Sequence, residues 1–312
     1  MKLDWGCPVI ASYELNGITL HPLLDTGNAS RSFVVPSDVF SRLKLESVTK
    51  TSMPEYTGVV KQVDWGYLQV PRLGSGVKHL TSVFDYPLNT TPAQPFDSIM
   101  PYDMLDADYV IFLLSQNRLR LEPAVPNPAW LNNEMYAVPF LRIQDFIVVA
   151  ISCEGKHDFI CLDTGCARSI FYSEYATHHS GTFVPTGKFD DYERDSTHFP
   201  SCNVYRVMRG LSLQGETADF DVPLSGDFDV AARISQAAPS DNKDTRVTTQ
   251  LLPYERNDAP SIVSAGFLGM DVLSQYDFML DNADSMLYLW SPDETPQIFP
   301  PGGAAPVRRR KR

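Results

Sequence analysis

The sequence predicts a mostly β protein built from two similar halves, and three observations support this prediction. Short runs such as residues 63–70 and 203–207 alternate apolar and polar residues, which is the period of strands. Two segments 138 residues apart can be superposed without gaps, and a second pair of similar segments lies further along the chain. The length of 312 residues accommodates two units of about 150 residues each.

The first pair of segments predicts two β-hairpins that end in the same tripeptide. In residues 9–27 and 147–165 an apolar run turns at a glycine and returns as a second strand. These second strands end in Asp25-Thr26-Gly27 and Asp163-Thr164-Gly165. The same spacing aligns Phe33 with Phe171.

The second pair of segments, residues 100–105 and 268–273, aligns at a spacing of 168. Each is followed by an apolar segment, a polar turn and a closing strand. Because this spacing exceeds that of the first pair, the second half must contain about 30 extra residues. We expect them in a surface loop near residues 225–260, where the sequence is polar.

These patterns predict four parts of the chain. The first lobe spans residues 1–123, a proline-rich interlobe linker spans 124–135, the second lobe spans 136–296, and a flexible basic tail spans 297–312. The helices are expected to be short, over residues 36–43 and 271–276, with Ser37 and Asp271 as caps.

Charge and composition restrict the partners. The net charge is −12, and without the five basic residues at positions 308–312 the body carries 21 basic against 38 acidic groups. Such a body repels phosphates, so no nucleic acid is expected to bind to it. No apolar stretch is long enough to span a membrane, and no signal peptide is apparent. The odd number of cysteines, five, fits free thiols inside a cell, although secretion stays open if the N-terminus is trimmed.

Two Asp-Thr-Gly motifs in matching contexts predict a pair of catalytic carboxyl groups. Hydrolysis of a peptide bond requires a base that deprotonates water and an acid that protonates the carbonyl oxygen. Two adjacent carboxyl groups can supply both, since their like charges drive their proton affinities apart. Gly27 and Gly165 allow the loops to approach closely, and Thr26 and Thr164 are suited to hydrogen-bond across to the opposite backbone. The structural alternative is that both motifs are merely turns at strand ends.

On these motifs the chain resembles the aspartic protease superfamily, combining a pepsin-like two-lobed chain with retropepsin-like motifs, from residue 9 to about 289. The resemblance implies two pseudo-symmetric β-barrel-like lobes with a cleft between them. It makes Asp25 and Asp163 the catalytic pair, with Thr26 and Thr164 interlocked beneath it. It also implies a hairpin flap whose tip, with Tyr56, Thr57 and Gly58, covers the substrate, although Tyr56 is equally explained as an exposed turn residue.

Three positions depart from the family pattern. Asn28 and Cys166 follow the two motifs where the family generally has a small hydroxyl residue or alanine, and Cys166 is a poor hydrogen-bond donor. Pro101 replaces the glycine of the apolar-apolar-Gly segment, which Gly269 keeps in the second half. Cys161 and Cys166 flank Asp163, which suggests either sensitivity to oxidation or two buried small residues.

Other chemistries find no support in the sequence. The histidines and cysteines show no metal-ligand spacing, and no Gly-x-Ser-x-Gly or phosphate-binding loop is present. The sequence thus predicts a monomeric aspartic endopeptidase, without metal or cofactor, that takes an extended peptide or protein substrate and has an acidic to mildly acidic optimum. The alternative is a weak or inactive pepsin-like protein that binds peptides or has a structural or regulatory role.

Overall fold

The structure, a computed structural model, is mostly β, as the sequence predicts. It describes residues 2–4, 7–28, 32–45, 47–54, 60–86, 96–123, 135–143, 146–190, 193–194, 197–198, 202–207, 211–215, 222–224, 229–233 and 263–292.

Eight strands of the first half form one sheet, in the order β1-β2-β5-β10-β6-β9-β8-β7. Strands β3 and β4 form a separate hairpin, which turns at Asn16 and Gly17, both with positive φ. The strands are β1 (Lys2–Asp4), β2 (Cys7–Val9), β3 (Tyr13–Leu15), β4 (Ile18–Leu20), β5 (Pro22–Asp25), β6 (Phe33–Val35), β7 (Thr49–Pro54), β8 (Val60–Pro71), β9 (Lys78–Asp85) and β10 (Ser98–Pro101).

A 14-stranded sheet contains most of the remaining strands, in the order β12-β11-β25-β26-β13-β14-β15-β24-β16-β23-β20-β17, with β21 and β22 beside β14. Its strands are β11 (Tyr109–Leu113), β12 (Arg118–Glu122), β13 (Tyr136–Ile143), β14 (Phe146–Cys153), β15 (Lys156–Leu162), β16 (Ile170–Tyr172), β17 (Phe183–Asp190), β20 (Cys202–Val207), β21 (Leu211–Leu213), β22 (Val222–Pro223), β23 (Asp229–Arg233), β24 (Gly266–Leu268), β25 (Asp277–Asp281) and β26 (Met286–Trp290). Strands β18 (Glu193–Arg194) and β19 (Thr197–His198) pair with each other.

The two halves repeat one strand arrangement. The order β2-β5-β10-β6-β9-β8-β7 in the first half corresponds to β14-β15-β24-β16-β23-β20-β17 in the second. Each neighbouring pair has the same direction in both halves; for example, β5–β10 and β15–β24 are parallel, whereas β10–β6 and β24–β16 are antiparallel. The internal repeat of the sequence therefore corresponds to a repeated topology.

Short helices occupy matching places in both halves. Helix α1 (Ser37–Arg42) follows β6 and α2 (Ser173–His178) follows β16, while η1 (Tyr102–Met104) follows β10 and α4 (Met270–Leu273) follows β24. A further turn, η2 (Leu114–Gln116), follows β11. The predicted caps are wrong: the N-cap residues of α1 and α4 are Pro36 and Gly269, without a side-chain capping bond. The Ser37 hydroxyl instead donates to Asp85 of β9.

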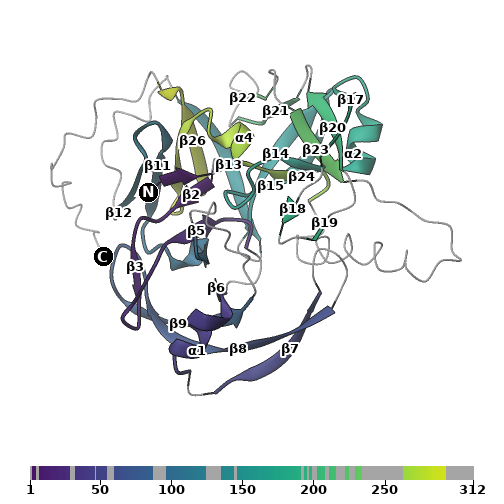
Figure 1. Cartoon of the computed structure of the whole chain (residues 1–312). Coiled ribbons are helices and arrows are strands. Elements are labelled where there is room, and N and C mark those ends of the chain that lie inside the picture. Colours follow the sequence, from purple (N-terminus) through teal and green to yellow (C-terminus); the bar gives the residue numbers. More distant parts are fainter. Residues whose placement is uncertain are drawn as a thin grey trace, which may run out of the picture.

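The halves share a sheet at the place where they meet (Figure 1). Strands β11 and β12, which precede the predicted linker, belong to the second sheet because β11 pairs with β25 along residues 109–112. Most of the linker, residues 124–134, lies outside the described residues, as does the whole predicted tail, residues 297–312.

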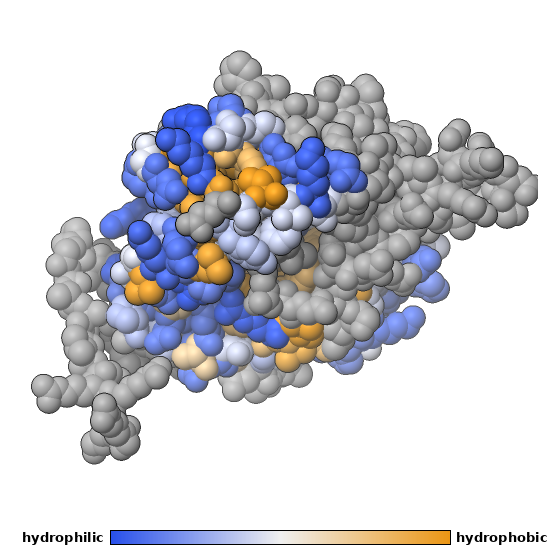
Figure 2. Space-filling model, turned by 90° about the horizontal axis from the view of Figure 1, so that it is seen from below, coloured by the Kyte–Doolittle hydropathy of each residue, from blue (hydrophilic) through white to orange (hydrophobic). Residues whose placement is uncertain are grey.

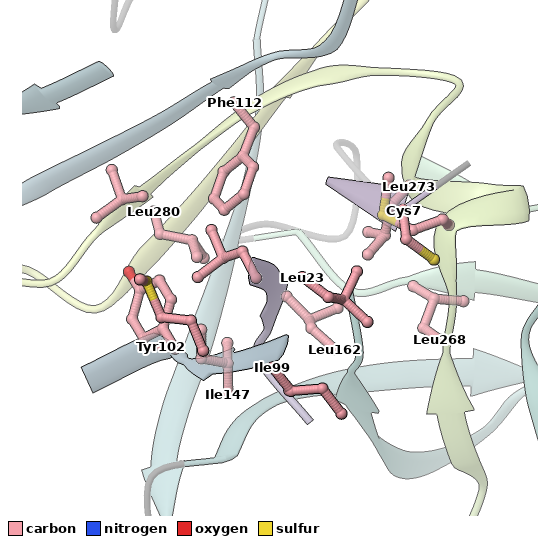
Figure 3. Packing of buried hydrophobic residues seen from close by; sticks show 14 of the residues in the cluster. Cys7, Leu23, Ile99, Tyr102, Phe112, Ile147, Leu162, Leu268, Leu273 and Leu280 are labelled. Atoms are coloured by element: carbon pink, nitrogen blue, oxygen red, sulfur yellow. The ribbon is translucent and has the colours of Figure 1, made fainter. Parts of the chain in front are cut away.

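The largest apolar cluster of the described residues draws on both halves and includes Leu24 and Leu162, which directly precede the two motif aspartates. Leu23 and Leu162, each close in sequence to one of the aspartates, converge with Ile99 and Leu268 from the neighbouring strands (Figure 3). These four side chains are buried. Burial of this shared surface favours the approach of the strand ends that carry the two motifs.

The extra residues of the second half are only partly where the sequence places them. Strand β23 lies inside the range 225–260 and pairs with β16 and β20, so it belongs to the repeated sheet. In the first half, residues 86–97 join β9 to β10, whereas residues 234–265 join β23 to β24. Much of the excess therefore follows β23, in a stretch of which the structure describes residues 263–265.

The surface seen from below mixes hydrophilic residues with separate apolar patches (Figure 2). Exposed apolar side chains of the first half include Tyr67 on β8 and Leu80 on β9. Beside Tyr67, Trp65 packs edge-on against it and stacks on Phe84, with ring centroids 5.2 and 5.8 Å apart. The contact of Trp65 with Phe84 stabilises the pairing of β8 with β9.

Candidate active site

The two motif aspartates occupy equivalent positions at the ends of β5 and β15. Asp25 is the last residue of β5 and lies opposite Pro101 in the parallel pair β5–β10. Asp163 follows β15 directly, and its amide donates to the carbonyl of Leu268 on the parallel strand β24 at 2.9 Å. Both aspartates are partly exposed, between a buried leucine and a buried threonine. Each strand end therefore presents its carboxylate at the surface of the shared core.

The threonines of the two motifs are joined by four reciprocal hydrogen bonds. The amide of Thr26 donates to Thr164 Oγ1 at 3.1 Å, and the amide of Thr164 donates to Thr26 Oγ1 at 3.0 Å. Thr26 Oγ1 donates to the carbonyl of Leu162 at 2.9 Å, and Thr164 Oγ1 donates to that of Leu24 at 2.7 Å. Both side chains are buried. The structure thus brings these residues together in the crossed arrangement that the sequence suggests, and it links the two loops rigidly.

The glycines of the two motifs lie directly against the carboxylates. The amides of Gly27 and Gly165 donate to Oδ1 of Asp25 and of Asp163, at 2.8 and 2.9 Å. A Cβ on Gly27 would lie 2.5 Å from Asp163 Cγ, and one on Gly165 would lie 2.5 Å from Asp25 Oδ1. Each carboxylate therefore contacts the glycine of its own loop and the glycine of the opposite loop. Only residues without a side chain leave room for this arrangement.

The residues after the two motifs form hydrogen bonds within their own loops. Asn28 Nδ2 donates to the carbonyl of Ser32 at 3.0 Å. Cys166 Sγ lies 2.8 Å from the carbonyl oxygen of Arg168, and the amide of Cys166 donates to the carbonyl of Asp163 at 3.3 Å. These local hydrogen bonds fix the backbone conformation of the loop that follows each aspartate.

The cysteines that flank Asp163 are buried, at 0% exposure for Cys161 and 7% for Cys166. Burial, together with the negative charge of Asp163, raises the pKa of the Cys161 thiol. Because oxidation proceeds through the thiolate, these observations favour buried small residues over an oxidation-sensitive site. Cys153 and Cys161 are free thiols.

The predicted flap residues Tyr56, Thr57 and Gly58 lie outside the described residues. On either side of them, β7 and β8 pair antiparallel from Thr49↔Trp65 to Pro54↔Val60. The sequence segment therefore lies between two strands of a hairpin, as expected.

The sequence did not predict the hydrogen bonds between Ser169 and Asp271, which are called the brace of the Asp163 loop below. The amide and the hydroxyl of Ser169 both donate to Asp271 Oδ1, at 2.8 and 2.6 Å. The amide of Gly269 donates to Ser169 Oγ at 3.0 Å. Ser169 is fully buried. The one sequence feature that could have drawn attention to Asp271 is its alignment with Asp103 in the second pair of repeated segments.

Asp271 is itself an unusual carboxyl group. Burial raises the pKa of this carboxyl above its ordinary value, while the hydrogen bonds from Ser169 and Val272 and the charge of Arg168 act to lower it. Its Oδ2 atom is buried without a hydrogen-bond partner. All the donors named here therefore converge on Oδ1.

Within the described residues, no group of three or more His, Cys, Asp or Glu side chains is arranged to hold a metal ion. No helix in this part of the chain is long and apolar enough to cross a membrane.

No protein-family model matches the chain. No curated protein matches it either.

Proposed function

We propose that this chain is an aspartic endopeptidase of the pepsin-like, two-lobed type, with Asp25 and Asp163 as its catalytic pair. The observation that carries the proposal is that each carboxylate lies against the glycine of the opposite loop, while the crossed threonines fix the two loops. The repeated order of seven strands supports the assignment of one aspartate to each lobe. If the two motifs were merely turns at strand ends, nothing would require their carboxylates to lie against the opposite loops.

The chemistry follows from two carboxyl groups that share one proton. The ionised aspartate accepts a proton from a water molecule, which attacks the peptide carbonyl carbon, and the protonated aspartate donates its proton to the carbonyl oxygen. The aspartate that accepted the proton from water then donates it to the amide nitrogen, while the other aspartate takes a proton back from one diol hydroxyl. The C–N bond breaks, the amine leaves, and the carboxyl product and the starting proton arrangement of the pair result. The glycine amides that hold Oδ1 of each aspartate keep both groups aimed at the reacting atoms. This mechanism operates without metal or cofactor.

We propose that the substrate is an unfolded or extended peptide segment bound in a cleft between the lobes. Such a segment pairs with the protein backbone like an added strand. The β7–β8 hairpin, with Tyr56 to Gly58 at its tip, is proposed to close over it. The protein is proposed to act as a monomer, since one chain supplies both aspartates.

The proposal is tested by incubating the protein with an unfolded protein at pH values from about 3 to 7 in water enriched in oxygen-18. We expect new peptides whose C-terminal carboxyl groups carry the heavy isotope, with the fastest cleavage at acidic to mildly acidic pH. Asp25→Asn protein purified in the same way controls for contaminating peptidases. Equal cleavage by this variant and the wild type, or none by either, would refute the proposal.

Gly165→Ala provides a second test because its new Cβ would overlap the Asp25 carboxylate. We expect kcat to fall about 100-fold, since displacement of a reacting group by about 1 Å has effects of that size. Gly155→Ala is the matched control: a Cβ there meets nothing within 4 Å, although its φ of +77° makes alanine somewhat strained. Its kcat is expected to stay within about 2-fold of wild type, and a similar loss in both variants would count against the pair.

The alternative is a weak or inactive pepsin-like protein that binds peptides or has a structural or regulatory role. Pro101 favours it, because it lies opposite Asp25 and offers no amide hydrogen there. Saturable binding of an unfolded peptide in a separate titration, with no cleavage in the isotope experiment above, would support this alternative.

A further inference from the structure

The loop that follows Asp163 is attached to the segment after β24 along its whole length. The carbonyls of Cys166 and Ala167 accept hydrogen bonds from the amides of Met270 and Asp271, at 2.8 and 3.1 Å. At the end of the loop, Ser169 donates twice to Asp271 Oδ1 and accepts from the amide of Gly269. Asp271 Oδ1 also accepts from the amide of Val272 at 2.9 Å. The loop and this segment are therefore joined by hydrogen bonds at both ends of the loop.

Close backbone contact reinforces this attachment. A Cβ on Gly269 would lie 2.6 Å from the carbonyl carbon of Arg168 and 2.8 Å from the carbonyl oxygen of Cys166. The backbones of the loop and of residue 269 are thus in direct contact. Since Cys166 follows Gly165, whose amide holds Asp163 Oδ1, a shift of the loop at Cys166 would carry the carboxylate of Asp163 with it.

The Asp25 loop is attached differently. Pro101 lies opposite Asp25, and Gly269 has the corresponding position in the second half, one residue after the pair Leu162↔Leu268. Because proline has no amide hydrogen, the hydrogen bond from Gly269 to Ser169 has no equivalent in the first half. Here Ser32, whose carbonyl accepts from Asn28, is hydrogen-bonded through its hydroxyl to Ser82 of β9 at 2.7 Å. The described contacts of the Asp25 loop thus include one to β9, whereas those of the Asp163 loop include the segment after β24.

We propose that Ser169 and Asp271 are positioning residues that hold the Asp163 loop in its catalytic geometry, an inference that rests on the proposed function. Neither residue is expected to touch the substrate. Their role is to keep Gly165 and Cys166 in place, so that Asp163 stays aligned with Asp25.

The experiment compares Ser169→Ala with Ser115→Ala. Ser115 is a matched control because its amide and hydroxyl also donate to a buried aspartate, Asp277, at 2.8 and 2.6 Å, between η2 and β25. We expect Ser169→Ala to lower kcat about 10-fold with KM within about 2-fold, since the change affects alignment rather than binding. Ser115→Ala is expected to leave both constants within about 2-fold.

Two further variants of Asp271 test whether its hydrogen-bond acceptor oxygen is required. Asp271→Asn keeps an oxygen that can accept the three donors, so it is expected to stay within about 3-fold of wild-type kcat, whereas Asp271→Ala should lose at least about 10-fold. If Asp271→Ala does not fold, the comparison of Ser169→Ala with Ser115→Ala still decides the proposal.

Amide hydrogen exchange gives a readout that does not depend on catalysis. We expect the amides of Thr164, Gly165 and Cys166 to exchange about 10-fold faster in Ser169→Ala and at the wild-type rate in Ser115→Ala. The inference is overturned if the amides of Ser169→Ala exchange at the same rate as those of Ser115→Ala. It is also overturned if the wild type cleaves peptide and the two variants have the same kcat. If the wild type cleaves no peptide, the proposed function fails, and exchange alone then decides whether the brace holds this loop.

Discussion

Replacing Asp25 or Asp163 by asparagine is expected to lower kcat for peptide hydrolysis roughly 10⁴-fold, because each change removes one partner of the acid–base pair. Asparagine has the size of aspartate and retains an oxygen that can accept the bond from Gly27 or Gly165. The variants should therefore keep the fold and still bind peptide. The measurement is kcat and KM on a peptide derived from the cleavage sites, together with the urea midpoint of unfolding.

The double variant tests whether the two aspartates act as a unit. If they share one proton, Asp25→Asn/Asp163→Asn should lose no more activity than either single variant, since one change already disables the pair. Asp38→Asn, an exposed aspartate on α1, is the control for loss of a charge and should retain full activity. Losses that multiply in the double variant would show that the aspartates contribute independently.

The repeated motifs could be predicted from the sequence because their causes are local. Asn16-Gly17 and Glu154-Gly155 both adopt positive φ at the turn before the motif strand, which glycine permits at low cost. Asp-Thr-Gly then follows at the same distance in each half. The mostly β class followed from the alternation of apolar residues, which depends on the same short-range period.

The residues beyond the motif could not be aligned from the sequence. Helices α1 and α2 begin at Ser37 and Ser173, 136 residues apart rather than 138. In agreement with this shift, Val34 pairs with Ile99 whereas Ile170 pairs with Phe267. The alignment of Phe33 with Phe171 is therefore wrong by two residues. A strand that follows a loop can change register without changing its apolar pattern when the shift is even.

The brace on the Asp163 loop was missed for a different reason. Ser169 and Asp271 are 102 residues apart, and both are common residue types with no distinctive spacing. The pairing of β24 with β15 and with β16 brings them together. Strand β23 was likewise obscured, since its partner β16 lies far away in sequence and its flanking residues are polar. Long-range contacts of this kind leave little trace in a single sequence.

Thr26→Val is expected to lower the free energy of unfolding by about 2–5 kcal/mol, and Thr164→Val by a similar amount. Valine fits the same volume but lacks the hydroxyl. In Thr26→Val the amide of Thr164 loses its acceptor and the carbonyl of Leu162 loses a donor. These groups lie in the buried link between the halves, where each unpaired polar group costs about 1–3 kcal/mol. Urea unfolding of the purified variants gives the values.

Thr81→Val is the matched control for these variants. Thr81 is also a buried threonine, at 3% exposure. Its hydroxyl, however, has only long contacts, 3.5 Å to the carbonyl of His79 and 3.4 Å to Met104 Sδ. Because little hydrogen bonding is lost, we expect its free energy of unfolding to change by less than about 1 kcal/mol. Thr26→Ser, which keeps the hydroxyl, should recover most of the loss. Equal destabilisation by Thr81→Val and Thr26→Val would mean that burial of the methyl groups, and not the crossed hydrogen bonds, holds the aspartate loops together.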